Sequence, residues 1–275
     1  MEIDIIAYSD LQLATLKADQ ILSVQEAQAK KDNLIWPADG GREETDTESE
    51  TDTQNESETQ ALTPEPPTFR TDLSDYESYM NAPSESYLIL VNKQNTIGAD
   101  YIPEGLVRVK DAKKNIDLVE TAAKALEAMF IEMRAEGFDD VFVTSAYRSY
   151  AYQSGLFDTY INQEMAAAPS ISREEAKARV LRYSAYPGTS EHQTGLCVDL
   201  MTNSMRELDE TFADHPVYDW LCENAWKFGF ILRFPADKVP LTGYDFEPWH
   251  YRFVGRQASY EIHTEGLCLE EYLKK

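Results

Sequence analysis

The stretch PGTSEHQTGLCVDLM, residues 187–201, combines a histidine, a turn and a short apolar strand. Gly195 permits the turn, and residues 196–201 have the pattern of a strand. Asp199 lies inside this otherwise apolar strand, where a carboxylate costs free energy unless it is paired or bound to a metal. His192 and Asp199 are seven positions apart and are joined by the turn. The two side chains can therefore converge on one cation.

A second stretch, YDFEPWHYRFVG, residues 244–255, places Glu247 three positions before His250 at the start of an aromatic strand. Two histidines and one aspartate with an open fourth position are typical of catalytic zinc sites, since structural sites are usually closed and rich in thiolates. A nearby carboxylate that binds no metal is the natural general base, and Glu247 is suitably placed. Taken singly, a histidine before a strand is usually a packed or surface residue; the two stretches together favour a metal site.

The helix signature HExxH is absent, so the zinc site would belong to a different scaffold. A third stretch, VTSAYRSYAYQSGLF, residues 143–157, places Arg148 where a strand turns into a helix. An arginine there can present its planar fork to a carboxylate or an oxyanion. The alternative is a solvated or salt-bridged side chain, and the residue alone does not decide between them.

The pattern along the chain predicts an α+β fold. We expect a small, mainly antiparallel sheet with helices packed on it, with the zinc site at the sheet and a disordered acidic segment before it. The expected strands are residues 87–92, 140–145, 196–201, 230–234 and 249–254. The expected helices are residues 116–137, 150–165, 172–183, 216–228 and 255–275.

Charge is unevenly distributed along the chain and separates an acidic N-terminal part from the rest. The net charge is −24, from 49 acidic and 25 basic residues, and residues 1–83 contain 19 of the acidic and 5 of the basic ones. Such an excess argues against binding to nucleic acid or to an anionic membrane surface. Residues 40–67 are nearly free of apolar side chains and should be disordered. We expect an N-terminal helical segment at 1–39, an acidic disordered linker at 40–83 and a catalytic domain at 84–275.

No run of 18 apolar residues predicts a transmembrane helix, and the first residues lack the basic start of a signal peptide. The sequence assigns no oligomeric state. The three cysteines form no CxxC pair. Cys222 and Cys268 could pair, but free thiols are the favoured interpretation for all three, Cys197 included.

The three stretches, in this order, resemble the zinc D-alanyl-D-alanine carboxypeptidases of the vancomycin-resistance type, the VanY-like family, over residues 87–275. The pattern Ser-x-Tyr-Arg-Ser-x-x-x-Gln matches Ser145, Tyr147, Arg148, Ser149 and Gln153. The pattern Ser-x-His-x-x-Gly-x-x-x-Asp matches Ser190, His192, Gly195 and Asp199. The pattern Glu-x-Trp-His matches Glu247, Trp249 and His250. No matched position departs from these patterns.

The resemblance implies a role for each matched residue. The Zn²⁺ ligands would be His192, Asp199 and His250, and Glu247 would be the catalytic base. Arg148 would stabilise the developing oxyanion. The substrate contacts would be Gln153, Ser190, Ser149 and Tyr147. His215 and His263 match no motif and are expected to be surface or capping residues.

The implied activity is removal of the C-terminal D-alanine from peptidoglycan stem peptides. An L,D-carboxypeptidase acting on tetrapeptide stems and an endopeptidase with the same zinc centre are alternatives. A non-catalytic wall-binding module is disfavoured, because Glu247 and all three expected ligands are present. The expected location is extracytoplasmic, at the cell surface, with a signal or anchor that precedes the present chain; a cytoplasmic enzyme is the alternative.

Overall fold

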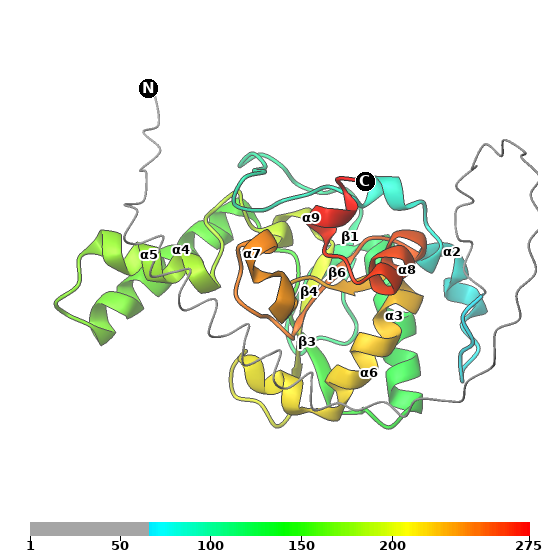
Figure 1. Ribbon diagram of the computed structural model, residues 1–275. Helices are drawn as coiled ribbons and strands as arrows, with labels where there is room; N and C mark the ends of the chain where they lie inside the picture. The colour runs from blue at the N-terminus through cyan, green and yellow to red at the C-terminus, as the bar shows by residue number, and fades with distance from the viewer. Residues whose placement is uncertain (1–65) are drawn as a thin grey trace, which may run out of the picture. The chain divides into compact units, whose positions relative to one another are not determined.

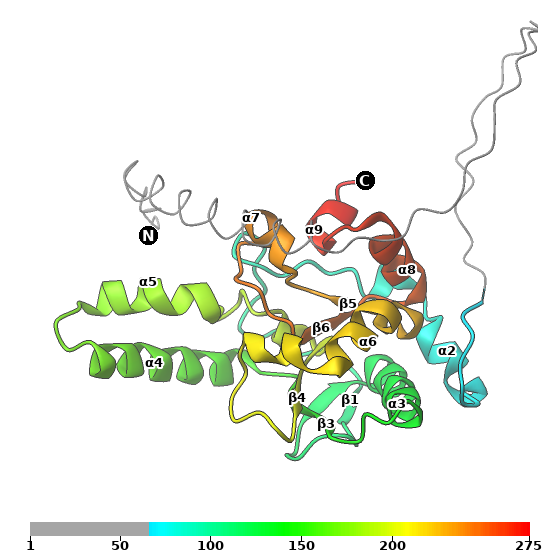
Figure 2. The ribbon, with the colours of Figure 1, turned by 60° about the horizontal axis from the view of Figure 1, so that its bottom comes forward.

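A four-stranded antiparallel sheet with the strand order β3-β4-β6-β5 lies at the centre of the fold (Figure 2). A computed structural model describes residues 66–275, and the structural statements below concern these residues. The central strands β4 (Cys197–Thr202) and β6 (His250–Phe253) are buried throughout. β3 (Val141–Ser145) and β5 (Phe230–Leu232) form the edges. This arrangement confirms the predicted α+β fold with a small antiparallel sheet.

The two faces of the central strands have different chemistry, because successive side chains of a strand point to opposite faces. Val198 and Leu200 of β4, together with Tyr251 and Phe253 of β6, belong to the main apolar core. The alternate positions of the same two strands are Cys197, Asp199, His250 and Arg252. The polar side chains of the predicted site therefore lie on one face of the sheet, and the apolar core lies on the other.

Helix α3 (Glu120–Ala135) packs on the apolar face through one stripe of side chains. Ala122, Leu126, Met129 and Met133 of this stripe are 1% exposed or less. The other helices of four or more residues are α2 (Glu77–Met80), α4 (Tyr150–Ala167), α5 (Arg173–Tyr183), α6 (Pro216–Asn224), α7 (Val239–Thr242), α8 (Arg256–Glu265) and α9 (Leu269–Tyr272). The 3₁₀ turns include η3 (Glu191–Thr194), η4 (Glu210–Asp214) and η5 (Ala225–Phe228). A two-stranded hairpin pairs β1 (Leu106–Arg108) with β2 (Asp117–Val119).

Helices α4 and α5 lie side by side and extend away from the sheet (Figures 1 and 2). They bury an apolar cluster of their own, formed by Phe157, Ile161, Ala176 and Val180. Ser149 and Ser172 cap the two helices by accepting hydrogen bonds from backbone N–H groups in the first turns. None of the helices in the described region has both the length and the apolar character needed to cross a bilayer.

Some predicted elements differ from the observed ones. Residues 87–92 form no strand; the guanidinium of Arg252 binds the carbonyl oxygens of Tyr87 and Ile89, which are the groups that a neighbouring strand would use. The predicted helix 116–137 begins only at Glu120, because the residues before it pair as β2. The predicted C-terminal helix ends first at Gly266, whose φ of 63° is left-handed, and α9 follows.

The linker predicted for residues 40–83 extends too far. Residues 1–65, which contain the predicted helical segment and the first part of the linker, lie outside the described residues. Within residues 66–83, Leu73 and Met80 are buried, and the helix α2 packs on α3. The acidic composition of this segment led to the wrong boundary, although the segment also contains apolar residues at helical spacings of four, three and four. These residues pack in or against the core and are Phe69, Leu73, Tyr76 and Met80.

Candidate metal centre and active site

Three side chains from distant parts of the chain meet on the polar face of the sheet. His192 lies in η3, Asp199 lies in β4, and His250 begins β6. Antiparallel pairing places Asp199 directly opposite His250. Nε2 of His192 is 3.3 Å from Oδ2 of Asp199, and Nδ1 of His250 is 3.0 Å from Oδ1. All three residues are buried. The structure therefore brings the three predicted ligands together.

The turn between His192 and β4 depends on Gly195. Its φ is 66°, a left-handed backbone conformation that residues other than glycine rarely adopt. A Cβ at this position would lie 3.1 to 3.2 Å from side-chain atoms of Leu106, Pro103 and Val119. The glycine thus lets the chain reverse closely against the β1–β2 hairpin and brings His192 over the strand.

Each imidazole has one nitrogen engaged on the side away from Asp199. Nδ1 of His192 is 2.6 Å from the carbonyl oxygen of Ala146, which can only accept a hydrogen bond. Nε2 of His250 is 2.8 Å from Oε1 of Glu191. In neutral imidazoles these partners hold the protons on Nδ1 of His192 and Nε2 of His250. The other two nitrogens then face Asp199 with lone pairs.

This arrangement fits a divalent cation. Two nitrogen lone pairs facing a carboxylate repel it unless a cation lies between them. Oδ1 of Asp199 is buried and has no hydrogen-bond partner among the described residues, although Nδ1 of His250 is close. Two imidazole nitrogens and a carboxylate, whose oxygens lie 3.0 and 3.3 Å from them, are the donor types that zinc takes in catalytic sites. One zinc ion would satisfy all of these atoms.

Cys197 is a competing ligand that the sequence analysis missed. Its thiol forms a possible metal group with His192 and His250, with the ligand atoms within 4.8 Å of one another. Cys197 is fully buried, whereas Asp199 lines the two clefts at the site. Asp199 is thus the candidate third ligand that faces the clefts, and Cys197 lines neither of them.

Glu247 lies beside the three predicted ligands. Its Oε2 is 3.5 Å from Nδ1 of His250, and its side chain is 14% exposed. The backbone N–H of His250 donates to the carbonyl oxygen of Glu247, so a turn joins the two residues. Burial raises the pKa of Glu247 to about 7, against the opposing effect of His250. A carboxylate with such a pKa is suited to accept and return a proton near neutral pH.

Arg148 follows β3 and lines both clefts, whose volumes are about 300 and 460 Å³. Its backbone N–H donates to the carbonyl oxygen of His192 at 3.2 Å, which ties this junction to the ligand loop. Its Nε is buried and has no hydrogen-bond partner among the residues of the described region. Because Arg148 lines both clefts, its guanidinium can present N–H donors to an anionic group there.

The four predicted substrate contacts have different surroundings. Ser190 lines the cleft that contains Glu247, and Tyr147 lines the other cleft. Ser149 lines this second cleft too, but its hydroxyl caps α4. Gln153 lines neither cleft; it is buried, and its Nε2 donates to the carbonyl oxygen of Ala185 at 2.8 Å. Gln153 therefore braces the segment that forms one wall of the cleft.

Several residues at the site were missed in the sequence. Tyr160 lines both clefts, and Tyr244 lines the one that contains Glu247. Glu191 accepts a hydrogen bond from His250. The available signal for Glu191 was its position as the one acidic residue in the stretch 183–198. The tyrosines carried no such signal, because the chain contains 16 of them.

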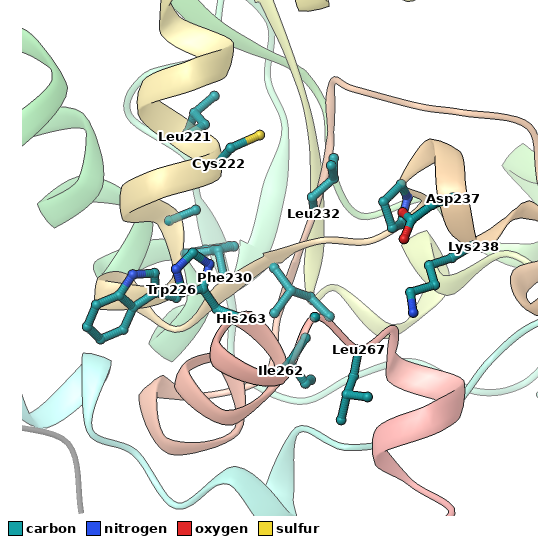
Figure 3. Close-up of a pocket in the computed structure, with 14 residues that line it drawn as sticks. Leu221, Cys222, Trp226, Phe230, Leu232, Asp237, Lys238, Ile262, His263 and Leu267 are labelled. Carbon is teal, nitrogen blue, oxygen red and sulfur yellow. The ribbon is translucent and has the colours of Figure 1, made fainter. Parts of the chain in front are cut away.

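Another hollow of about 200 Å³ lies between α6, η5 and α8 (Figure 3). Apolar side chains form most of its wall, and the rings of Trp226 and His263 stack with centroids 5.8 Å apart. None of the predicted site residues lines it. Cys222 lines it, and all three cysteines are free, as expected. His215 caps α6 through Nδ1, which agrees with the expected capping role.

Comparisons with known proteins agree with these structural features. A family model described as VanY, D-alanyl-D-alanine carboxypeptidase, matches residues 115–256, more than half of the chain. The D-alanyl-D-alanine carboxypeptidase of Enterococcus faecalis (strain ATCC 700802 / V583) is 40% identical over 186 residues. That match covers 68% of this chain and 65% of the relative, so it spans less than two thirds of the relative's length.

Two solved structures show the same fold. A mutant of the vancomycin-resistance D,D-pentapeptidase VanY, in complex with Zn(II), superposes with a TM-score of 0.58 at 39% identity, over 68% of this chain and 98% of that chain. The LD-carboxypeptidase LdcB superposes with a TM-score of 0.59 at 37% identity, over 68% of this chain and 85% of that chain. The chain belongs to the VanY family of D-alanyl-D-alanine carboxypeptidases.

Proposed function

We propose that this protein is a zinc-dependent carboxypeptidase that removes the C-terminal D-alanine from peptidoglycan stem peptides. The observation that carries the proposal is the convergence of His192, Asp199 and His250 on one point beside Glu247, at the floor of two adjoining clefts. The activity named for the Enterococcus faecalis relative and the zinc in the D,D-pentapeptidase structure support the assignment.

In this proposal each polar group has one chemical task. His192, Asp199 and His250 would hold a zinc ion, which would supply a Lewis acid for the scissile carbonyl and would lower the pKa of water. Glu247 accepts the proton of the attacking water and delivers it to the leaving amine of the terminal residue. The bond to the carbonyl carbon forms from the water oxygen, and the peptide C–N bond breaks. The products are a shortened peptide and free D-alanine.

Arg148 stabilises the negative charge that develops on the carbonyl oxygen. The position of Arg148 in the walls of both clefts supports this role, because a fixed donor in a site that excludes water is more effective than one exposed to water. Ser190 and Tyr147 are the proposed direct substrate contacts, since both line a cleft. Ser149 and Gln153 hold the walls of the site through the α4 cap and the bond to Ala185.

An L,D-carboxypeptidase acting on tetrapeptide stems is the second candidate. The likeness to LdcB supports it, with an identity close to that of the D,D-pentapeptidase. The two activities need the same metal and the same base, and they differ in the stereochemistry of the residue before the scissile bond. Pocket shape around that residue therefore decides between them.

Stem-peptide cleavage can be tested directly with the purified, zinc-loaded chain. We expect a muropeptide pentapeptide to lose the mass of one alanine, with slower loss from the tetrapeptide. Preferred cleavage of the tetrapeptide would support the L,D activity instead. Release of cross-linked fragments from intact walls would indicate an endopeptidase. An unchanged mass of both muropeptides and no solubilised wall material, with zinc bound, would contradict the proposal.

We assign the action of the enzyme to the extracytoplasmic side of the membrane, where stem peptides of the assembled wall lie. Recycling of wall fragments in the cytoplasm is the alternative. Fractionation of the native host separates the two: recovery with the cell surface or the medium supports the first, and recovery with the cytoplasm supports the second.

A further inference from the structure

Four charged side chains are buried together behind His250, on the side away from Asp199. Glu191, Arg233, Arg252 and Glu270 are 3%, 0%, 0% and 6% exposed. Nε2 of His250 is 2.8 Å from Oε1 of Glu191. The second oxygen, Oε2, accepts hydrogen bonds from Nε of Arg233 at 3.0 Å and from Nη1 of Arg252 at 2.9 Å. The cluster therefore begins at a predicted metal ligand.

The arginines determine which oxygen of Glu191 remains for the imidazole. Both guanidinium groups bind Oε2, so that Oε1 is directed to His250. Two donors on one oxygen and a third on the other leave the carboxylate little freedom to rotate.

The arginines are in turn held by other groups. Arg233 forms a two-pronged pair with Glu270 of α9, with distances of 2.6 and 2.8 Å. Nη2 of Arg252 donates to the carbonyl oxygens of Tyr87 and Ile89, at 2.8 and 2.9 Å. Contacts from residues 87–89 and from α9 therefore hold the two arginines in place.

Stability alone does not explain such a cluster. Removing a charge from water costs several kcal/mol per ion, and replacing buried ion pairs by apolar side chains is often neutral or stabilising. A carboxylate that fixes the orientation of a metal-binding imidazole is a better reason to bury four charges, because such partners typically change metal affinity about 10- to 100-fold.

We propose that Glu191 is a positioning residue, held by Arg233 and Arg252, which turns His250 so that Nδ1 faces the metal and Nε2–H faces the protein interior. The inference rests on the metal site of the proposed function. It assigns no contact with substrate to Glu191, which acts only through His250.

Glu270 offers a matched control. It is also a buried glutamate bound to Arg233, but no contact joins it to His250 among the described residues. Both glutamates accept from a buried guanidinium, so loss of either charge should weaken folding. Glu191 contacts the imidazole directly, whereas Glu270 reaches it only through Arg233 and Glu191, so loss of Glu270 should affect the metal ligand much less.

The test compares Glu191→Gln with Glu270→Gln. Glutamine has a single acceptor oxygen, so either His250 or the arginine pair must lose its acceptor. Zinc affinity of the metal-free full chain is measured by competition with a chromophoric chelator, and stability is measured by urea unfolding.

We expect Glu191→Gln to weaken zinc binding about 10- to 100-fold. We expect Glu270→Gln to change zinc affinity less than about threefold, with a comparable loss of stability. Wild-type affinity in Glu191→Gln, or equal weakening in both variants, would overturn the inference.

A measurement on the wild-type protein keeps the inference testable if Glu191→Gln does not fold. Nitrogen NMR of the zinc-loaded chain should show Nε2 of His250 protonated and Nδ1 bound to the metal. Binding through Nε2 would refute the proposed role of Glu191. Absence of zinc binding by the wild-type chain is a different result, which contradicts the proposed function and with it the basis of this inference.

Discussion

Asp199 and His250 face each other across the β4–β6 pairing, with Oδ1 of the aspartate 3.0 Å from Nδ1 of the histidine. Both atoms are acceptors when the imidazole proton lies on Nε2, where Glu191 accepts it. Two buried acceptors at this distance require either a proton or a metal cation between them. The site is therefore incomplete without a metal or protons, and this requirement leads to the predictions below.

Glu247→Gln should separate catalysis from metal binding. The amide cannot accept the proton of water, so we expect kcat to fall by about 10²- to 10⁴-fold. Glu247 is not one of the three predicted ligands, so zinc content should remain that of the wild type. Single-turnover assays and metal analysis of the same sample check this prediction. Wild-type kcat in the variant would exclude Glu247 as the base.

Asp199→Asn and Cys197→Ser should behave differently toward zinc. We expect Asp199→Asn to lose most bound zinc, because a neutral amide is a weaker ligand for a hard or borderline cation than a carboxylate. Cys197→Ser should retain zinc, since Cys197 lines neither cleft, whereas Asp199 lines both. Metal analysis after dialysis measures both. Retention by Asp199→Asn together with loss by Cys197→Ser would reverse the ligand assignment.

Arg148→Gln should reduce transition-state stabilisation without changing zinc content. We expect kcat/KM to fall by about 10²- to 10³-fold, as for loss of one donor to an oxyanion. Arg182→Gln is the matched control. The side chain of Arg182 is 69% exposed, and its Nη2 is 3.6 Å from Oδ2 of Asp245 in a surface ion pair. Its kinetics should remain close to those of the wild type. Similar losses in both variants would indicate a general charge effect rather than a specific role of Arg148.

Met80→Ala should destabilise the domain. Met80 is fully buried in the main core although it lies in the segment that the composition assigned to a linker. We expect a loss of about 2–5 kcal/mol in the free energy of unfolding, from lost apolar contact and the cavity left behind. Urea unfolding measures the loss, and Ser78→Ala on the same short helix is the control, since Ser78 is exposed. An unchanged midpoint for Met80→Ala would place residues 66–83 outside the folded unit.

Removal of zinc should abolish activity reversibly. Dialysis against a chelator empties a site that is open to a cleft, and added Zn²⁺ should restore turnover to the wild-type level. Full activity in protein shown by metal analysis to lack divalent ions would contradict the proposed mechanism. Glu247→Gln, treated in the same way, should regain zinc without regaining turnover.

Local pattern was sufficient for most elements of the sheet and for the long helices. The predicted helices 150–165 and 172–183 match α4 and α5 closely, because capping serines and apolar stripes act within a few residues. The same reasoning failed for residues 87–92. Their apolar composition is that of a strand, but the partner of their carbonyl oxygens is Arg252, more than 160 positions away.

The amino-acid sequence by itself determined which groups are available: two histidines, an aspartate, a glutamate and an arginine in three motifs in a set order. These identities depend only on residue chemistry and short spacings. Only the tertiary structure decided which imidazole nitrogen faces Asp199, that Cys197 lies among the candidate ligands, and that Glu191 lies behind His250. Glu191 and His250 are 59 positions apart, and no local pattern encodes a contact that forms only when strands β4 and β6 pair and the residues behind them pack.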